Sequence, residues 1–201
     1  MLIYDIFFGL PEGVDMGTFT DQQRISTYWF NKANNLYGAA AAVYHAIQND
    51  ADFPRSQYGL GDGFSMAVAC PIVYRMLCGM ALEALLKAII VESKNEPRQT
   101  HNLKQLAQDA DISYSKEDQK LLLILSEAVI WDGRYPVPKK ETNWDNLIEL
   151  KKDYLYNKRP FVKGSTMMTY SPNDKLNWES FQNLWSIPMT KLYEIAHWIL
   201  R

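Results

Sequence analysis

The feature that most constrains the fold of this chain is a long apolar stretch between residues 64 and 93. Within it, residues 76–91 contain only two charged side chains, Glu83 and Lys87. A helix that is apolar on nearly all of its faces is stable only when other elements surround it. We therefore predict a buried central helix here, which Pro71 either starts or kinks.

Helical periodicity also covers the sequence on both sides of this stretch. From residue 21 to about residue 49, apolar side chains recur every three, four or seven positions, and Thr20 with Gln23 matches a capping box. Further helices are predicted at about residues 100–109, 115–132, 143–155 and 178–199.

Single residues are expected to set the limits of these helices. Thr100, Ser115 and Asn143 are suited to N-capping, because their side-chain oxygens accept hydrogen bonds from free backbone amides. Gly133 stands where a left-handed residue is expected to end a helix. Pro188 is expected to bend the last helix.

The intervening segments carry turn and loop signals. Residues 50–63 are rich in glycine and polar residues, and residues 134–138 contain two prolines. Within the loop at residues 157–173, short strands are predicted at 161–162 and 167–170.

Together these patterns predict a single all-α domain over residues 1–201. We expect an up-and-down helical bundle of about five to six helices. A minor β-hairpin is expected from the N-terminal arm (residues 1–19, through residues 2–8) and the 157–173 loop. The C-terminal helix is expected at residues 177–200.

Composition excludes several classes of protein. The 201 residues are 47% hydrophobic and 22% charged, and a disordered chain has a lower hydrophobic content than this. The 21 basic and 23 acidic side chains leave a net charge of −2, so the chain lacks the strong positive field of a dedicated nucleic-acid binder. No basic signal-peptide region and no run of roughly 18 uncharged apolar residues occurs. We therefore expect a cytoplasmic protein that does not enter a membrane.

Motifs for several common enzyme chemistries do not occur in the sequence. It contains no glycine-rich phosphate loop, no His-Glu-x-x-His, no Cys-x-x-Cys and no Gly-x-Ser-x-Gly. Its two cysteines, Cys70 and Cys78, lie too far apart on one helix to form a disulfide. The sequence predicts no cofactor and no metal site.

The central helix carries a stripe of residues spaced by four: Arg75, Gly79, Glu83 and Lys87. Glu83 precedes Lys87 in the order that favours a helical ion pair. Gly79 leaves room for close approach by another backbone or by a ligand. Either these charges satisfy one another at the edge of the bundle, or they form part of a binding site.

Two residues beyond this helix are further candidates. His101 begins a short helix whose amides could receive an anion, or it helps, with Asn102, to cap that turn. Arg134, held by a Tyr-Pro turn, either binds a phosphate or carboxylate or pairs with an acidic neighbour. Residues 134–163 contain eight basic and four acidic side chains. This excess favours an anion-binding face, an interface between subunits or a solvated surface.

Three segments together resemble a known family. They are Arg75 to Lys87 (RMLCGMALEALLK), Thr100-His101-Asn102-Leu103 and Gly133-Arg134-Tyr135-Pro136. They are similar to the HEPN domain, a helical bundle named for nucleotide binding in higher eukaryotes and prokaryotes, over about residues 64–150. The resemblance implies a helical bundle that dimerises. It also implies a nucleotide or RNA site around Lys87, His101, Arg134 and Tyr135.

Many HEPN proteins are metal-independent ribonucleases, in which an arginine is followed by a histidine after four to six residues. In this chain the nearest such pair is Arg98 and His101, with only two residues between them. The catalytic motif is absent as written, so the resemblance does not carry ribonuclease activity to this chain.

Three functions follow as hypotheses. The first is a non-catalytic HEPN-like module that binds a nucleotide, RNA or another phosphorylated ligand, and its candidate residues are Arg75, Glu83, Lys87, His101, Arg134 and Tyr135. The first alternative is an interaction or assembly scaffold that acts as a homodimer through exposed aromatic residues, namely Trp178, Trp185, Phe161 and Tyr170. The second is an atypical metal-independent ribonuclease, with His101 as general base and Arg98 or Arg134 stabilising the phosphorane.

Overall fold

The computed structural model describes residues 23–163 and 166–196, and this part of the chain is mainly helical, as predicted. Its elements are α3 (Ser26–Asn49), α4 (Phe53–Tyr58), α5 (Met66–Ala69), α6 (Pro71–Glu92), α7 (Leu103–Asp109), α8 (Lys116–Glu127), the π-helix η1 (Ala128–Asp132), α9 (Glu141–Tyr154), β1 (Tyr156–Pro160), β2 (Met168–Pro172) and α10 (Trp178–Ile195). None of the described helices is long and apolar enough to cross a membrane.

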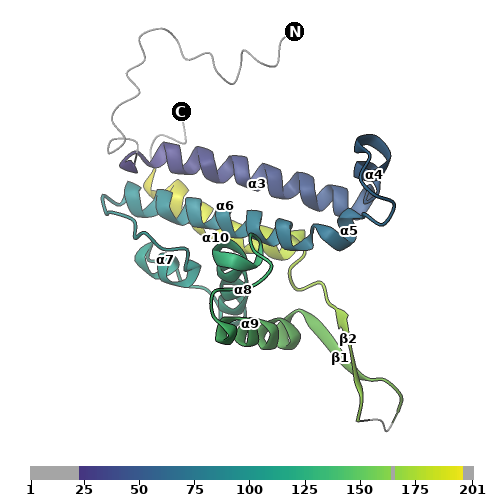
Figure 1. Cartoon of the computed structure of the whole chain (residues 1–201). Helices are drawn as coiled ribbons and strands as arrows, with labels where there is room; N and C mark the ends of the chain where they lie inside the picture. Colours follow the sequence, from purple (N-terminus) through teal and green to yellow (C-terminus); the bar gives the residue numbers. More distant parts are fainter. Residues whose placement is uncertain (1–22, 164–165, 197–201) are drawn as a thin grey trace.

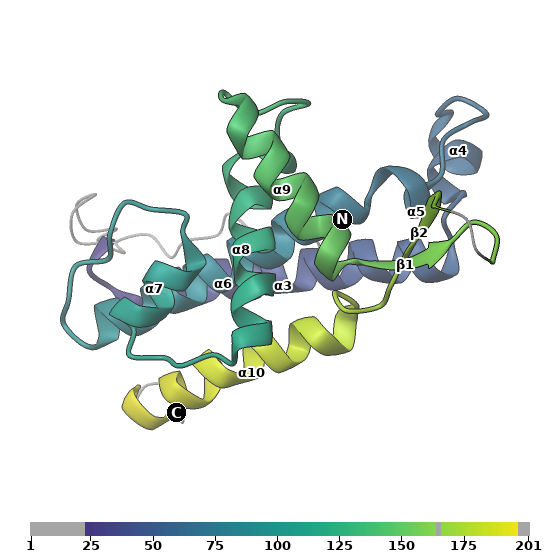
Figure 2. The same cartoon turned by 90° about the horizontal axis from the view of Figure 1, so that it is seen from below.

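Helix α6 is the central element. Figure 1 shows α3 running beside α6 on one side, with α7, α8 and α9 on the other. Figure 2 shows α10, which packs against α6, and α8 running across α6. Pro71 is the first residue of α6, so it starts the helix rather than kinking it. The predicted buried central helix is therefore confirmed.

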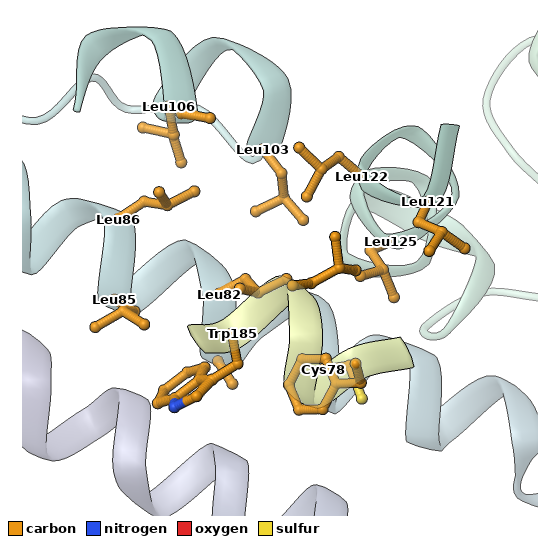
Figure 3. Close-up of a cluster of buried hydrophobic side chains, with 14 of the residues drawn as sticks. Cys78, Leu82, Leu85, Leu86, Leu103, Leu106, Leu121, Leu122, Leu125 and Trp185 are labelled. Atoms are coloured by element: carbon orange, nitrogen blue, oxygen red, sulfur yellow. The ribbon is translucent and has the colours of Figure 1, made fainter. Parts of the chain in front are cut away.

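The core forms where leucines of α6 meet those of α7 and α8. Leu82, Leu85 and Leu86 are fully buried. Figure 3 shows Leu82 and Leu86 toward the leucines of α7 and α8, and Leu85 on the opposite side of α6, near Trp185 of α10. Burying a leucine contributes about 1.5–3 kcal/mol relative to leaving it exposed. This cluster therefore ties α7, α8 and α10 to one central helix.

Gly79 allows α8 to cross close to α6. A Cβ atom at this position would lie 2.7 Å from the Leu125 carbonyl oxygen and 2.7 Å from the Val129 side chain. The sequence predicts a close approach here, and the structure shows that a backbone makes it. Gly133 is tight in the same way, because a Cβ would lie 2.6 Å from that of Met76. Its φ is −87°, so the expected left-handed conformation is wrong and space alone requires the glycine.

Gly79→Ala tests this crossing. We expect it to lower the free energy of unfolding by about 1–3 kcal/mol, because the methyl group overlaps a backbone carbonyl that cannot move freely. Gly38→Ala is the matched control: it lies within α3 with no atom near its added Cβ, and should raise stability by about 0.5–1 kcal/mol. Urea denaturation measures both, and an unchanged Gly79→Ala variant would contradict the close crossing.

At several helix ends, the residue at the N-cap differs from the one predicted. Helix α7 is capped by Asn102, whose side chain accepts a hydrogen bond from the Gln105 amide, and not by Thr100. Helix α9 begins before Asn143, with Lys140 at its N-cap. By contrast, the Ser115 cap of α8 is confirmed. The presence of a capping residue type therefore does not by itself fix where a helix begins.

Other boundaries also differ. Residues 50–63, predicted as a loop, contain the short helix α4, which ends at Gly59 in the left-handed conformation. Helix α3 begins at Ser26, and no side chain caps it. Thr20 of the predicted capping box and the predicted pairing of residues 2–8 lie outside the described residues.

Residues 156–172 form a hairpin of their own. The predicted strand at residues 161–162 is wrong, because β1 ends at Pro160, whereas the strand predicted at 167–170 overlaps β2. Strands β1 and β2 pair antiparallel, with Tyr156 opposite Pro172 and Lys158 opposite Tyr170. Figure 1 shows the hairpin projecting from the helical body. Phe161 and Tyr170 are exposed, as the scaffold hypothesis requires.

An aromatic cluster joins α3 to α10. The Tyr37 ring lies with its centroid 5.0 Å from that of Trp178, 5.6 Å from that of Phe181 and 4.7 Å from that of Trp185. Trp185 is only 8% exposed, so its predicted place on an exposed interaction surface is wrong. Trp178 is also partly buried against the core. Both side chains serve internal packing because the buried face of α10 lies against α3 and α6.

Tyr114 ties the segment before α8 to α10, because its hydroxyl donates a hydrogen bond to the Leu184 carbonyl over 3.1 Å. Burial raises the pKa of this hydroxyl above its ordinary value of 10.0. The unfolded chain therefore loses this proton at a lower pH than the folded protein does. Stability should fall as the pH rises above about 10.

Tyr114→Phe tests this contribution. At pH 7 it should cost about 1 kcal/mol through the lost hydrogen bond, and above pH 10 its stability should fall less steeply than that of the wild type. Denaturant titrations at pH 7 and at several pH values above 10 measure both effects. Tyr193→Phe, at an exposed tyrosine of α10, should leave stability at pH 7 unchanged. Equal alkaline slopes for wild type and Tyr114→Phe would refute the prediction.

Candidate functional site

A buried ion pair on α6 forms the base of the candidate site. The Lys87 Nζ lies 2.7 Å from Oε1 of Glu83, and their side chains are only 7% and 12% exposed. The same Nζ lies 5.4 Å from the centre of the Trp29 ring on α3. The charge of Lys87 is thus enclosed between a carboxylate and an indole. Lys87 holds Glu83 in place rather than facing solvent.

His101 extends this pair toward the surface. Its Nδ1 lies 2.9 Å from Oε2 of Glu83, and the imidazole is 49% exposed. The loop that carries it is fixed just beyond, where the Leu103 amide donates to the buried Ser126 hydroxyl over 2.9 Å. Glu83 therefore uses one oxygen for Lys87 and the other for His101, which orients the exposed ring.

A pocket of about 430 Å³ opens beside this chain of contacts. Helix α3, helix α6, η1 and the loops after α6 and η1 supply its lining: Trp29, Lys32, Leu36, Met76, Met80, Glu83, Ala84, His101, Val129 and Arg134. We call it the α3–α6 pocket. Its floor is apolar, and its polar groups are the carboxylate of Glu83 and the side-chain nitrogens of Lys32, His101 and Arg134.

Arg134 reaches the α3–α6 pocket from an anchored turn. The amides of Arg134 and Tyr135 both donate to the Trp131 carbonyl, over 2.9 and 2.8 Å. The Arg134 guanidinium lies 5.3 Å from the Tyr135 ring centre and donates to its hydroxyl over 3.3 Å. Neither Arg134 nor Lys32 forms an ion pair with a described residue, although both line the pocket. Their charges are available to an anion.

The structure separates Arg75 from the other predicted residues, and it places Tyr135 beside Arg134 rather than in the lining of the α3–α6 pocket. Glu83, Lys87 and His101 are in direct contact, and Arg134 joins Glu83 and His101 in the lining of the α3–α6 pocket. Arg75 instead lines a different cavity, together with Lys151. Residues spaced by four drift around a helix by about 40° per step, so Arg75 and Glu83 differ by about 80°.

Arg98, considered for phosphorane stabilisation, has another partner. Its Nε lies 2.8 Å from a carboxylate oxygen of Asp109, at the end of α7. It does not line the α3–α6 pocket. Arg134 is therefore the arginine that shares a pocket with His101.

Sequence reasoning missed Trp29 and Lys32. Both lie on α3, and with Leu36 they follow the 3–4 spacing of one helix face. That spacing was the available signal, but it is shared with every amphipathic helix. Only the packing of α3 against α6 shows that this face meets Glu83.

Comparison with protein-family models, curated proteins and solved structures finds no match for this chain. Among residues 23–163 and 166–196, no group of three or more His, Cys, Asp or Glu residues is placed to hold a metal ion. The contacts described above therefore carry the functional interpretation.

Lys87→Met tests the buried pair. Removing one partner leaves Glu83 buried with only His101 beside it, so we expect the free energy of unfolding to fall by about 3 kcal/mol. The double variant Glu83→Gln/Lys87→Met removes both charges and should recover a large part of this loss. Urea denaturation at pH 7 measures the set. A Lys87→Met variant as stable as the wild type would show that the pair is not structural.

Proposed function

We propose that this chain is a non-catalytic, HEPN-like helical module that binds a nucleotide, RNA or another phosphorylated ligand in the α3–α6 pocket. The observation that carries the proposal is the combination of an apolar floor with two unpaired cations, Lys32 and Arg134, at one pocket. A nucleotide combines the two matching parts: a base whose flat faces stack on apolar surfaces, and an anionic phosphate.

The apolar floor suits a base. Met76, Met80 and Leu36 offer adaptable apolar surface, and the Trp29 indole stands at the pocket wall. Methionine and aromatic side chains pack against planar rings without requiring one hydrogen-bonding pattern. This floor supports recognition of a base by its shape, without selection of one base.

The basic groups suit a phosphate. Arg134 offers a planar guanidinium on an anchored turn, and Lys32 offers a flexible ammonium from the facing helix. His101, which Glu83 orients, supplies a third nitrogen at the same pocket. The carboxylate of Glu83 does not repel an anion strongly, because Lys87 neutralises it at 2.7 Å.

Nucleotide titration of charge variants tests the proposal. Adenosine monophosphate, guanosine monophosphate and a short single-stranded RNA are added to wild type, Lys32→Ala and Arg134→Ala. A ligand at 100 times its Kd stabilises the protein by about 2.7 kcal/mol, which corresponds to a rise of about 5–11 °C in Tm. Each variant should weaken binding by about tenfold or more, because it removes a charge-assisted contact.

Lys152→Ala, an exposed lysine of α9 outside the pocket, is the matched control and should bind like the wild type. The proposal fails if the double variant Lys32→Ala/Arg134→Ala binds these ligands as well as the wild type. It also fails if none of the three ligands shifts the Tm of the wild type.

A ribonuclease is a second candidate, and one observation favours it. The Glu83 carboxylate orients the His101 imidazole in the way that a general base requires, with Arg134 lining the same pocket. Incubation of the short RNA with wild type and His101→Ala distinguishes the two functions. Cleavage by the wild type that disappears in the variant would replace the binding function with catalysis, and intact RNA would remove the ribonuclease candidate.

An assembly scaffold is the remaining candidate. The observation in its favour is the exposed apolar surface of the hairpin, where Phe161 is 64%, Val162 60% and Met167 64% exposed. Exposed apolar clusters commonly mark interaction sites. Light scattering of the wild type supports this candidate if it shows a stable homodimer while no nucleotide binds.

A further inference from the structure

A second cavity of about 750 Å³ lies at the N-terminal end of α6, and it shares no lining residue with the α3–α6 pocket. It lies where α3, α5 and α6 meet the end of α9, the hairpin and the start of α10. We call it the Arg75 cavity. The residues used below are Arg75, Lys151, Leu155, Tyr156, Leu176 and Asn177, all of which line it.

Arg75 is an incompletely satisfied cation in this cavity. Its Nε is buried and makes no hydrogen bond, and Arg75 forms no ion pair with any described residue. Burial lowers the pKa of its guanidinium. A buried charge without a partner costs free energy, so its presence needs an explanation.

The carboxylate that acts electrostatically on Arg75 is paired with another cation. Asp132 influences Arg75 electrostatically, but its carboxylate oxygen lies 2.5 Å from the Nζ of Lys151. Both side chains of that pair are nearly buried, at 10% and 13% exposed. Burial also lowers the pKa of Lys151, and the charge of Arg75 lowers it further. Two cations therefore share one carboxylate beside the cavity, which leaves one positive charge uncompensated.

The remaining lining of the Arg75 cavity is suited to the apolar part of an organic ligand. Leu155, Leu176 and the Tyr156 ring provide apolar surface at the same cavity. Asn177 adds an amide, although its oxygen is already used to cap α10 by accepting from the Ser180 amide over 2.8 Å. The Asp174 carboxylate, also in the lining, is exposed and forms no ion pair with a described residue. Among its charged groups, only Arg75 and Lys151 are held in partly buried positions.

We propose that the Arg75 cavity binds an organic anion, whose carboxylate or phosphate group is held by Arg75 and Lys151 while its apolar body packs against Leu155, Leu176 and Tyr156. A guanidinium and an ammonium that face one oxyanion provide the charge-assisted hydrogen bonds that Arg75 lacks in the free protein. This site is independent of the nucleotide proposal, because the two cavities are lined by different residues.

Binding of two small probes tests the site. Phenylacetate carries the carboxylate and phenyl phosphate carries the phosphate, and both have an apolar ring. Calorimetric or NMR titration should show saturable binding of at least one probe to the wild type at up to millimolar concentrations. Arg75→Gln should weaken that binding by about tenfold or more. Arg159→Gln, at an exposed arginine of β1 outside both cavities, should change it less than twofold.

The stability of the free protein provides a second readout. Because Arg75 is a partly buried cation whose Nε is buried without a hydrogen bond, Arg75→Met should raise the Tm by about 2–4 °C in the absence of ligand. A purely structural arginine would give a lower Tm instead. The proposal is overturned if neither probe binds the wild type, or if Arg75→Gln binds the probes as well as the wild type does. It is also overturned if the control variant loses probe binding as much as Arg75→Gln does, or if Arg75→Met melts at a lower temperature than the wild type.

Discussion

Helix α6 is apolar around nearly its whole circumference, and the positions of the other helices follow from the need to keep it from water. Leu82 and Leu86 require cover from α7 and α8, while Leu85 lies beside Trp185 on the opposite side. One helix cannot cover all of these faces, because its contact surface is a stripe about 100° wide. Several helices therefore surround α6, and α8 crosses it instead of running alongside.

The same burial determines what a charge on α6 can do. A charged side chain within this helix must find a partner or face a cavity. Glu83 and Lys87 find each other, and Glu83 also reaches His101. Arg75 lies beyond this set and faces its own cavity. Two polar sites thus arise on one helix for the same physical reason.

Sequence reasoning succeeded where the determining interactions are local. The burial of α6 follows from its lack of charge, and the Ser115 cap depends on residues three positions apart. It was less accurate where several local signals compete, as with Thr100 and Asn102. The Glu83–Lys87 pair follows from helical spacing alone, whereas the contribution of Lys32 depends on how α3 packs against α6. No local pattern encodes that register.

The π-helix η1 has a consequence for how this protein can change over evolution. Its wider turn, closed by the Gly133 amide on the Ala128 carbonyl, accommodates one residue more than an α-helical turn would. Deletion of a single residue there would convert the turn to ordinary α-helical geometry, and the Gly133 amide could still close it on the Ala128 carbonyl. Arg134 would keep its place after this turn, and every core leucine of α6 and α8 would remain. The fold can therefore lose one residue here without a new core.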